Sequence, residues 1–487
     1  MADSESLRSK AMSSLVWKFL ERVGYQAIQI VIQIVLARLL TPDDFGVLAI
    51  MIVFVNVGNV IVQSGLNTAL VQSKEATDTD CSTVFWMSLA ISLVLYAAIF
   101  LGAPAVARFY RMPVLVWPLR TLCLILVINA FNAVQVARVQ RALEFRKVFV
   151  ATIVSIVVSG VAGISVARMG GGVWALVAQQ LSYQLTNCLV LAVQLRWVPR
   201  FAFDARRAVE LFSFGWKLLA SGLLETGYQS LSDLIVGAQF THADLGVFSQ
   251  GKKYPQAVGT ILDGSVQPIM LSAISRVQED RTAVKRLTRR AIKTSTFIVV
   301  PAMVCFAVAA RPLVRLLLGE QWLPSVPYLQ IFCLVYAFLP VHTTNLQALN
   351  GTGHSDLFLK LEIIKKLYGA ALLFIGAFVF KSPLAIALGS LVGSLISTFV
   401  NSYPNARVMG YSFGEQVRDY APAFALAAVA GAASWSMQLL GLSDLVTLML
   451  QVLVMIVVYL GVAWVTHVEE FEYLLRNVRS LVAGRLS

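Results

Sequence analysis

Charged side chains inside long apolar runs are the residues of this sequence that can do chemistry. Nine Lys and Arg lie within these runs, against five Asp and Glu. An ionisable side chain is costly inside a membrane, so it normally faces a partner or a water-filled cavity. Because cations are in excess, such a cavity is expected to receive an anionic guest. The candidate substrate-binding cations are Arg22, Arg120, Lys18, Lys217, Lys253 and Lys365.

Arg22 is the strongest of these candidates, because it lies well inside its run, roughly 12 Å deep at the helical rise. Lys18 and Lys217 lie near the ends of their runs. A long side chain in that position also reaches the membrane surface, which is the alternative role for both. Lys253 has the alternative of facing the lipid head groups. The sequence therefore leaves Lys18, Lys217 and Lys253 with two alternative roles each.

Neutral polar residues recur at helical spacing in the same runs. Tyr25 and Gln29 project on the same side of a helix as Arg22, at 100° per residue. Amide and hydroxyl groups donate and accept hydrogen bonds, which suits sugar hydroxyls, whereas cations suit phosphate. Asn and Gln stripes also hold membrane helices together, which is the alternative role. The predicted polar cavity residues are Tyr25, Gln29, Asn56, Gln63 and Gln256.

Two acidic motifs look catalytic at first, and the sequence argues against both. Asp43 and Asp44 lie in LTPDDFGVLAI, whose copy 200 residues later, FTHADLGVFSQ, keeps only Asp244. Because half a carboxylate pair is not expected to survive, the shared Thr-x-x-Asp predicts a helix N-cap instead. DTD at 78–80 matches the DxD of nucleotide-sugar glycosyltransferases, but its loop of about ten residues has no room for a nucleotide-binding domain. No enzymatic activity is predicted.

Long apolar helices must position all of these residues. The chain of 487 residues is 58% hydrophobic and 13% charged, whereas a soluble domain carries roughly 25% charge. We expect an all-α polytopic membrane protein with about 14 spans, because only helices or closed barrels satisfy the backbone in lipid. The expected spans are 14–38, 45–70, 83–106, 113–137, 148–167, 173–195, 212–238, 245–272, 291–310, 325–348, 357–380, 384–404, 420–440 and 445–466.

Lys and Arg in the loops predict the orientation. The loops on the side of the N-terminus carry 24 of them, and the opposite loops carry 6. The positive-inside rule then places both termini in the cytoplasm and accounts for the net charge of +13 without nucleic acid. Basic amphipathic stretches at 203–212 and 276–293, and the tail at 468–487, are expected along the membrane surface. Their alternative role is that of solvated orientation signals.

Motifs for cofactors and metals are missing from the sequence. There is no Walker A motif, so no energy from bound ATP is expected. The five cysteines form no CxxC pair and the four histidines are scattered, which argues against a disulfide framework and a metal site. We therefore predict no cofactor.

An internal repeat organises the spans. WKFL at 17–20 falls on WKLL at 216–219, and the turn at 40–50 falls on the turn at 240–250. Matches at nearly the same offset predict two parallel six-helix lobes, a transporter layout in which the substrate binds between the lobes. The predicted domains are 1–200 for the first lobe, 201–410 for the second, 411–467 for spans 13 and 14, and 468–487 for a cytoplasmic amphipathic tail.

Three motifs, ARLLTPDDFGVLAI, GLNTALVQ and QRALEFRK, resemble the polysaccharide transporter (Wzx-type) branch of the MOP exporter superfamily. This branch includes colanic acid, succinoglycan and xanthan exporters, and the resemblance covers essentially the whole chain. It implies a flippase that moves undecaprenyl-diphosphate-linked oligosaccharide repeat units from the cytoplasmic to the periplasmic leaflet of the bacterial inner membrane. The units would serve exopolysaccharide or lipopolysaccharide synthesis. A polysaccharide polymerase and chain-length machinery are then expected as further partners.

The resemblance also bears on particular residues. Lipid II flippases of the superfamily place basic residues of the first span inside the cavity, and Glu21–Arg22 resembles that arrangement in reversed order. Ion coupling occurs in the superfamily, and the candidates for it here are Asp263, Glu225 and Asp233.

Two other functions were weighed against the flippase. A multidrug or cation antiporter of the same fold would need a net acidic cavity, whereas the charges within these runs are net basic. A membrane-embedded polysaccharide polymerase or ligase would need a large outside loop, and the longest expected here, 311–324, has about 14 residues.

Overall fold

Helices make up most of the part of the chain that the structure describes. The computed structural model describes residues 17, 21, 24–63, 65–72 and 77–476, without the side chains at 68, 72, 214 and 262–266. No strand occurs among these residues, so the prediction of an all-α protein is confirmed. By their contacts the residues divide into two compact units, Met1–Gly246 and Val247–Ser487. The predicted lobe boundaries stay a prediction.

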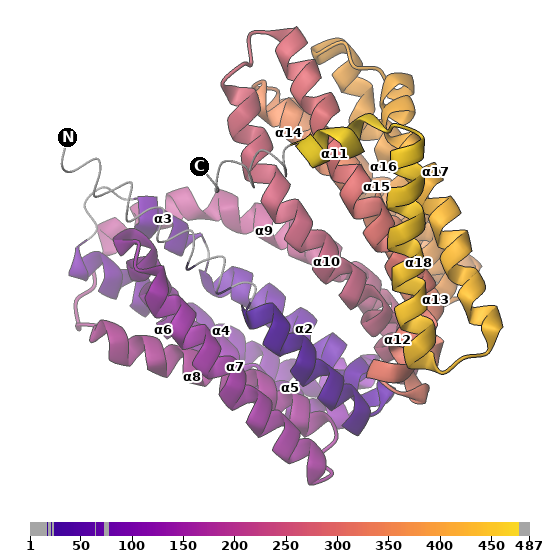
Figure 1. Ribbon diagram of the computed structural model, residues 1–487. Coiled ribbons are helices and arrows are strands. Elements are labelled where there is room, and N and C mark those ends of the chain that lie inside the picture. Colours follow the sequence, from indigo (N-terminus) through magenta and orange to yellow (C-terminus); the bar gives the residue numbers. More distant parts are fainter. Residues whose placement is uncertain (1–16, 18–20, 22–23, 64, 73–76, 477–487) are drawn as a thin grey trace, which may run out of the picture. The chain divides into compact units, whose positions relative to one another are not determined.

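The first unit is a bundle in which α7 packs along α8, α2 packs along α9, and α6 packs against both α4 and α8 (Figure 1). α6 thereby has neighbours on two sides, which brings its polar face close to other helices. The helices of this unit are Gly24–Leu39, α2 (Pro42–Gln63), α3 (Leu66–Gln72), α4 (Asp78–Phe109), η1 (Pro113–Leu115), α5 (Val116–Leu122), α6 (Leu124–Ala142), α7 (Phe145–Arg168), α8 (Val173–Leu195) and α9 (Ala205–Gln239).

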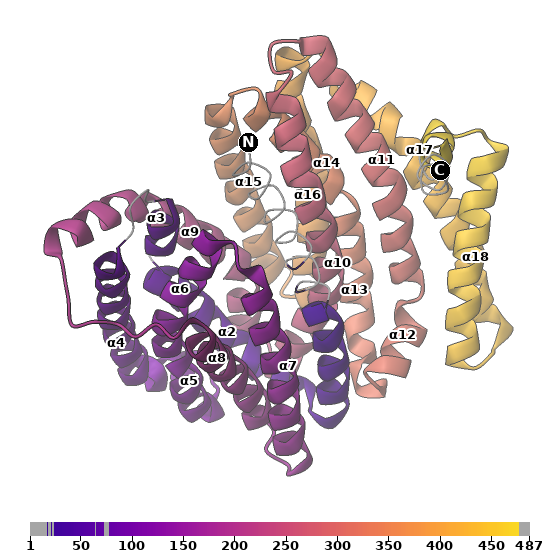
Figure 2. The ribbon, with the colours of Figure 1, turned by 60° about the vertical axis from the view of Figure 1, so that its left-hand side comes forward.

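The second unit is built around α11, which packs against α13, α14, α17 and α18 (Figure 2). α10 (His242–Ser275) begins in the first unit and continues into the second. The remaining helices are α11 (Arg281–Val308), α12 (Ala310–Leu317), η2 (Glu320–Ser325), α13 (Val326–Ala337), α14 (Leu339–Gly351), α15 (Ser355–Phe374), the π-helical η3 (Ile375–Val379), α16 (Pro383–Val408), α17 (Phe413–Ser436), η4 (Met437–Leu440) and α18 (Asp444–Val465).

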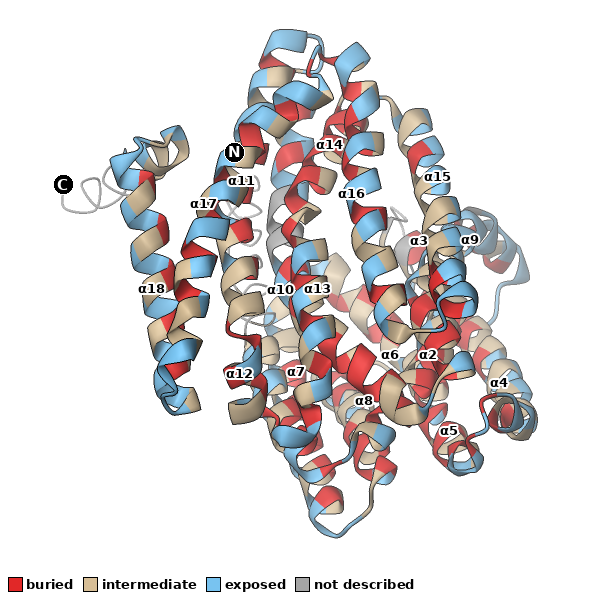
Figure 3. Ribbon diagram, turned by 90° about the vertical axis from the view of Figure 1, so that its right-hand side faces the viewer, coloured by how far each residue is buried: buried red, intermediate tan, exposed pale blue. Residues whose placement is uncertain are grey.

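Exposed apolar side chains cover the outer faces of these helices, as membrane spans require. On α16, Leu388, Val392 and Leu395 are exposed (Figure 3). Nine helical segments in the described part of the chain are long and apolar enough to cross a membrane. Each expected span overlaps one or more helices of the described residues. The count of about 14 spans and the orientation stay predictions.

Several expected segments differ from the observed helices, and 113–137 and 325–348 are each divided, at Cys123 and at Phe338. The range 45–70 is not one helix, because α2 ends at Gln63 and α3 begins at Leu66. Gly65 between them has φ +68°, and a Cβ there would lie 2.6 Å from the carbonyl oxygen of Gly215, so this break requires glycine. The basic stretches 203–212 and 276–293 are not separate surface helices, because α9 and α11 begin within them and run on into apolar sequence.

The duplicated turn is a pair of helix N-caps, as predicted. Asp44 Oδ2 accepts hydrogen bonds from the backbone N–H and the hydroxyl of Thr41, at 3.0 and 2.8 Å. Asp244 makes the same two bonds with Thr241, at 3.1 and 2.6 Å. The helices that follow begin at Pro42 and His242, again 200 residues apart. Each carboxylate therefore stabilises the start of a helix.

Two glycines allow the starts of α2 and α10 to cross at close range. A Cβ on Gly46 would collide with the carbonyl oxygen of His242, and a Cβ on Gly246 would collide with that of Pro42. Because the obstructing atoms are backbone, no side-chain movement relieves the clash. The close approach of the two copied turns therefore requires glycine at both positions.

The DTD motif at 78–80 ties the start of α4 to the rest of the first unit. Asp80 accepts hydrogen bonds from the backbone N–H and hydroxyl of Thr77 in a capping box, and it pairs with Arg207 at 3.1 Å. Asp78 pairs with Arg138 at 2.5 Å. Both carboxylates thus have structural partners within the first unit.

Candidate functional site

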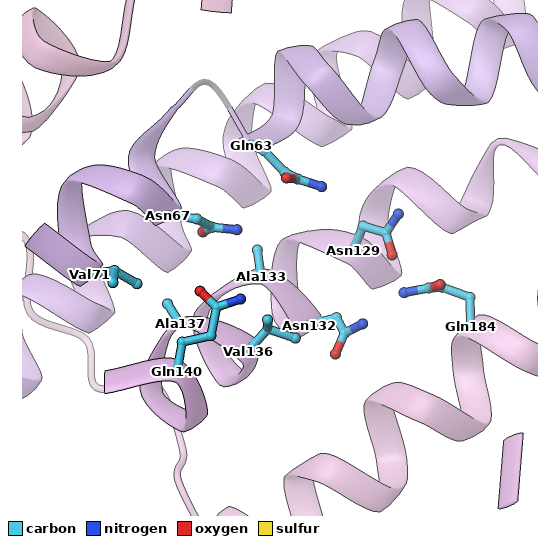
Figure 4. A pocket seen from close by; sticks show the side chains of 10 residues that line it. All are labelled: Gln63, Asn67, Val71, Asn129, Asn132, Ala133, Val136, Ala137, Gln140 and Gln184. Carbon is cyan, nitrogen blue, oxygen red and sulfur yellow. The ribbon is translucent and has the colours of Figure 1, made fainter. Parts of the chain in front are cut away.

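A polar hollow lies inside the first unit, where the end of α2, α3, α6 and α8 meet (Figure 4). Its volume is about 420 Å³, within the range of small-molecule pockets. Six side-chain amides converge on it, and no charged side chain among the described residues lines it. We call it the amide hollow; its lining residues are Gln63, Asn67, Val71, Asn129, Asn132, Ala133, Val136, Ala137, Gln140 and Gln184.

The spacing of residues on α6 explains why this face is polar. Asn129, Val136 and Gln140 are separated by seven and four residues, so they project from one side of a helix. Neighbouring helices hold two of the α6 amides in place. Asn129 Nδ2 donates to Asn59 Oδ1 at 2.5 Å, and Asn132 Nδ2 donates to Asn187 Oδ1 at 3.2 Å.

Two acceptor atoms of the amide hollow lack a donor from the described chain. They are Asn67 Oδ1 and Asn132 Oδ1, and both atoms are buried. A buried acceptor without a donor costs free energy, so such atoms point to a guest that donates hydrogen bonds. Sugar hydroxyls are donors and acceptors at once, and amides match them on both counts. The amide hollow is therefore chemically suited to a carbohydrate and not to a phosphate.

Of the predicted cations that the structure describes, Arg120, Lys217, Lys253 and Lys365 do not line the amide hollow, and they are distributed over both units. Lys18 and Arg22 lie outside the described residues. Arg120 Nε donates to the carbonyl of Phe100 at 3.0 Å, and its guanidinium lies over the Phe100 and Trp117 rings. Lys365 pairs with Glu362 on its own helix. Lys217 on α9 and Lys253 on α10 are exposed.

Gln63 is the one predicted polar cavity residue that lines the amide hollow. Tyr25 contacts the Tyr183 ring edge-on at 5.7 Å, and Gln29 is partly exposed. Asn56 is exposed on α2, and Gln256 is partly buried on α10. Their roles in a cavity stay predictions.

The predicted coupling acids are also spread along the chain. Glu225 accepts a hydrogen bond from Gln229 on the same helix at 2.7 Å. Asp233 is partly buried on α9, and the side chain of Asp263 lies outside the described ones. Among the residues the structure describes, no group of three His, Cys, Asp or Glu is placed to hold a metal ion.

Asn67 shares a helical face with the predicted Gln63, four residues before it in the expected span 45–70. The sequence prediction does not include the other four amides of the hollow: Asn129, Asn132, Gln140 and Gln184. The signal for three of them was present, because INAFNAVQVARVQ carries Asn and Gln at helical spacing. It does not stand out, since this stretch is also a predicted span with few charges. Gln184 also recurs at helical spacing with Gln180 and Asn187. Only the packing of α8 against α6 shows that this face meets the hollow.

A membrane helix bundle with a polar hollow between its helices is typical of membrane transporters. The protein is a multi-pass membrane protein of this class. Its chain belongs to the family described as polysaccharide biosynthesis protein, whose model matches residues 35–327. The predicted resemblance to polysaccharide transporters is thereby confirmed.

Two curated relatives extend this match over most of the chain. The succinoglycan biosynthesis transport protein ExoT of Rhizobium meliloti is 24% identical over 79% of this chain and 75% of its own length. The lipopolysaccharide biosynthesis protein WzxC of Escherichia coli is 22% identical over 83% of this chain and 82% of its own length. Among solved structures, the lipid II flippase MurJ in an inward closed conformation has a TM-score of 0.71 at 13% identity. It covers 93% of this chain and 99% of MurJ, which establishes a shared fold.

Proposed function

We propose that the protein is a flippase for undecaprenyl-diphosphate-linked oligosaccharide repeat units in the bacterial inner membrane. It would carry them from the cytoplasmic to the periplasmic leaflet, for assembly of an exopolysaccharide or lipopolysaccharide. Membership of the polysaccharide biosynthesis family supports the pathway, and relatives named as transport proteins support transport over catalysis. The amide hollow is the observation that carries the proposal, because its lining matches a carbohydrate guest.

The substrate has two chemically different parts, and we propose different residues for each. The amide hollow receives sugar, with Asn67 and Asn132 as acceptors for its hydroxyls. The diphosphate is assigned to cations, with Arg22 first among them because of its expected depth in the first span. Glu225, Asp233 and Asp263 remain the candidates for coupling to an ion gradient.

The proposed mechanism is alternating access between two six-helix lobes, 1–200 and 201–410, with both termini in the cytoplasm. Residues 411–467 would add two spans outside the repeat, and 468–487 would form a cytoplasmic tail. A polysaccharide polymerase and chain-length machinery would then use the flipped units on the far side of the membrane. No covalent step is assigned to this chain.

Deletion of the gene tests the proposal, with the lipid-linked repeat units followed by leaflet. Deleted cells should make little polymer and accumulate repeat units that face the cytoplasm, and the wild-type gene should restore export. The Arg22→Ala variant should insert into the membrane normally but restore little export in the deleted cells. Normal polymer output from deleted cells that lack a second exporter would overturn the flippase proposal. Unchanged export by Arg22→Ala would remove only that residue from the site.

A further inference from the structure

A second hollow, of different chemistry, lies in the second unit between the first turns of α11 and the helical segment 469–476. Its volume is about 490 Å³. Five of its side chains are cations and two are acids. We call it the arginine pocket; it is lined by Arg286, Arg289, Arg290, Lys293, Thr294, Glu469, Glu470, Tyr473 and Arg476.

Two of the five cations have carboxylate partners. Lys293 Nζ lies 2.5 Å from Glu469 and 2.8 Å from Glu470, which fastens the segment 469–476 to α11. The hydrogen bond from Lys293 holds the pKa of Glu469 below its usual range. The Glu469 carboxylate therefore stays ionised, and its ion pair with Lys293 persists, near neutral pH. Arg289 pairs with the buried Asp419 of α17 at 2.7 Å. These pairs build the walls of the pocket.

The other three cations of the pocket are arginines. Among the described residues, no carboxylate lies within the 4.0 Å of an ion pair from Arg286, Arg290 or Arg476. The guanidinium of Arg290 lies 3.6 Å from the centre of the Tyr473 ring, which fixes its plane and leaves its N–H groups at the edge available. Arg286 and Arg476 are exposed. Such a group of guanidinium N–H donors matches the oxygens of a phosphate.

Apolar surface lies beside this pocket. Ile298, one turn beyond Thr294 on α11, is 48% exposed, and Leu475 is 38% exposed. α18 ends at Val465, and Trp464 next to that end is 66% exposed, as is typical of a residue at a membrane interface. The pocket therefore lies where two spans end, at the level of lipid head groups. A free phosphate would make no use of the apolar flank, whereas acyl chains would cover it.

We propose that the arginine pocket binds the phosphodiester head group of an anionic membrane phospholipid, with the acyl chains along Ile298. Arg286, Arg290 and Arg476 supply the phosphate contacts, and the lipid bridges α11 to the segment 469–476. The site is separate from the amide hollow and does not depend on the flippase function. It also gives the basic stretch at 276–293 a role beyond orienting the chain in the membrane.

Lipid binding to the full-length protein tests this inference. In nanodiscs of phosphatidylcholine, with phosphatidylglycerol titrated in, native mass spectrometry counts retained phosphatidylglycerol and thermal unfolding reports stabilisation. The double variant Arg286→Gln/Arg476→Gln should weaken retention at least about tenfold, because two charge-assisted contacts are lost. The matched control is Arg276→Gln/Arg281→Gln, which removes the same charge from exposed positions outside the pocket. It should change retention less than about twofold.

Further arms identify the ligand. Arg290→Lys keeps the charge and loses the planar fork, so retention should also fall. If the pocket variant and the control variant lose phosphatidylglycerol retention equally, the effect comes from net charge alone, and the proposal of a specific site is wrong. Stabilisation of the wild-type protein by inorganic phosphate in pure phosphatidylcholine discs would overturn the lipid assignment. Preference for a polyprenyl diphosphate over phosphatidylglycerol would do the same and would make the pocket part of the substrate route.

Discussion

Two groups of amides, one in each unit of this protein, differ in how their side chains are used. In the first unit they line the amide hollow, and buried acceptors of Asn67 and Asn132 have no donor from the described chain. In the second unit, amides on α14, α16 and α17 bond to one another: Asn345 Nδ2 donates to Gln416 Oε1 at 2.8 Å, and Asn405 Nδ2 donates to Asn345 Oδ1 at 2.6 Å. We call Asn345, Ser402, Asn405 and Gln416 the amide network.

The difference teaches that the residue type does not decide the role of an amide in a membrane helix. Asn345 is fully buried, and neighbouring helices satisfy both ends of its side chain. An amide satisfied in this way holds helices together. An amide with one atom left over, beside open volume, is placed to bind a guest instead. Each of the following predictions tests that distinction by comparing stability with export.

The largest loss of stability is expected in the amide network. Asn345→Leu removes side-chain bonds to Gln416, Asn405 and Ser402. At roughly 0.6 kcal/mol per bond between membrane helices, the variant should lose about 2 kcal/mol. Thermal unfolding in detergent measures this, and export per folded molecule should stay near wild type. Asn56→Leu is the control, because it removes an exposed amide from α2. A fully stable Asn345→Leu would mean that the network does not hold the helices together.

A smaller loss is expected at the two copied N-caps. Thr41→Ala and Thr241→Ala each remove the same bonds to an aspartate, so each should cost about 1 kcal/mol. Asp43→Ala is the control, since Asp44 and not Asp43 makes the capping bonds. Equal losses at the two positions would show that both copies still use the turn in the same way. A loss at only one would show that the copies have diverged in energy while keeping their geometry.

Local signals in the sequence were sufficient for the positions of most helices and for the starts of two of them. Apolar runs located the helices, and Thr-x-x-Asp located the starts of α2 and α10. The amide hollow was different, because it depends on which faces of α6 and α8 meet. Nor does sequence show that the rings of Phe100 and Trp117 hold Arg120, since Phe100 comes from another helix. The break at Gly65 was missed because apolar residues continue before and after the short interruption QSG at 63–65.

The smallest loss of stability is expected in the amide hollow, together with a large loss of export. Asn67→Leu removes a buried acceptor that has no donor, so unfolding should change by less than about 0.5 kcal/mol. Export should fall about tenfold or more, because a sugar hydroxyl loses its partner and an apolar group takes its place. Val71→Leu is the matched control, since it enlarges an apolar side chain of the same hollow without removing an amide. It should keep most of the export.

The pattern across Asn67→Leu and Asn345→Leu decides whether the distinction between the two regions is real. In the amide hollow, Asn67→Leu is expected to lower export without lowering stability, because no contact that holds the fold is lost there. In the amide network, Asn345→Leu is expected to lower stability and, because less folded protein is present, the total export as well. If Asn67→Leu instead unfolds as easily as Asn345→Leu, its amide holds helices together and the unpaired acceptor is no sign of a guest. If both stability and export survive in Asn67→Leu, the substrate does not pass through the amide hollow. The sugar site must then be sought among the predicted polar residues that lie elsewhere, beginning with Tyr25 and Gln256.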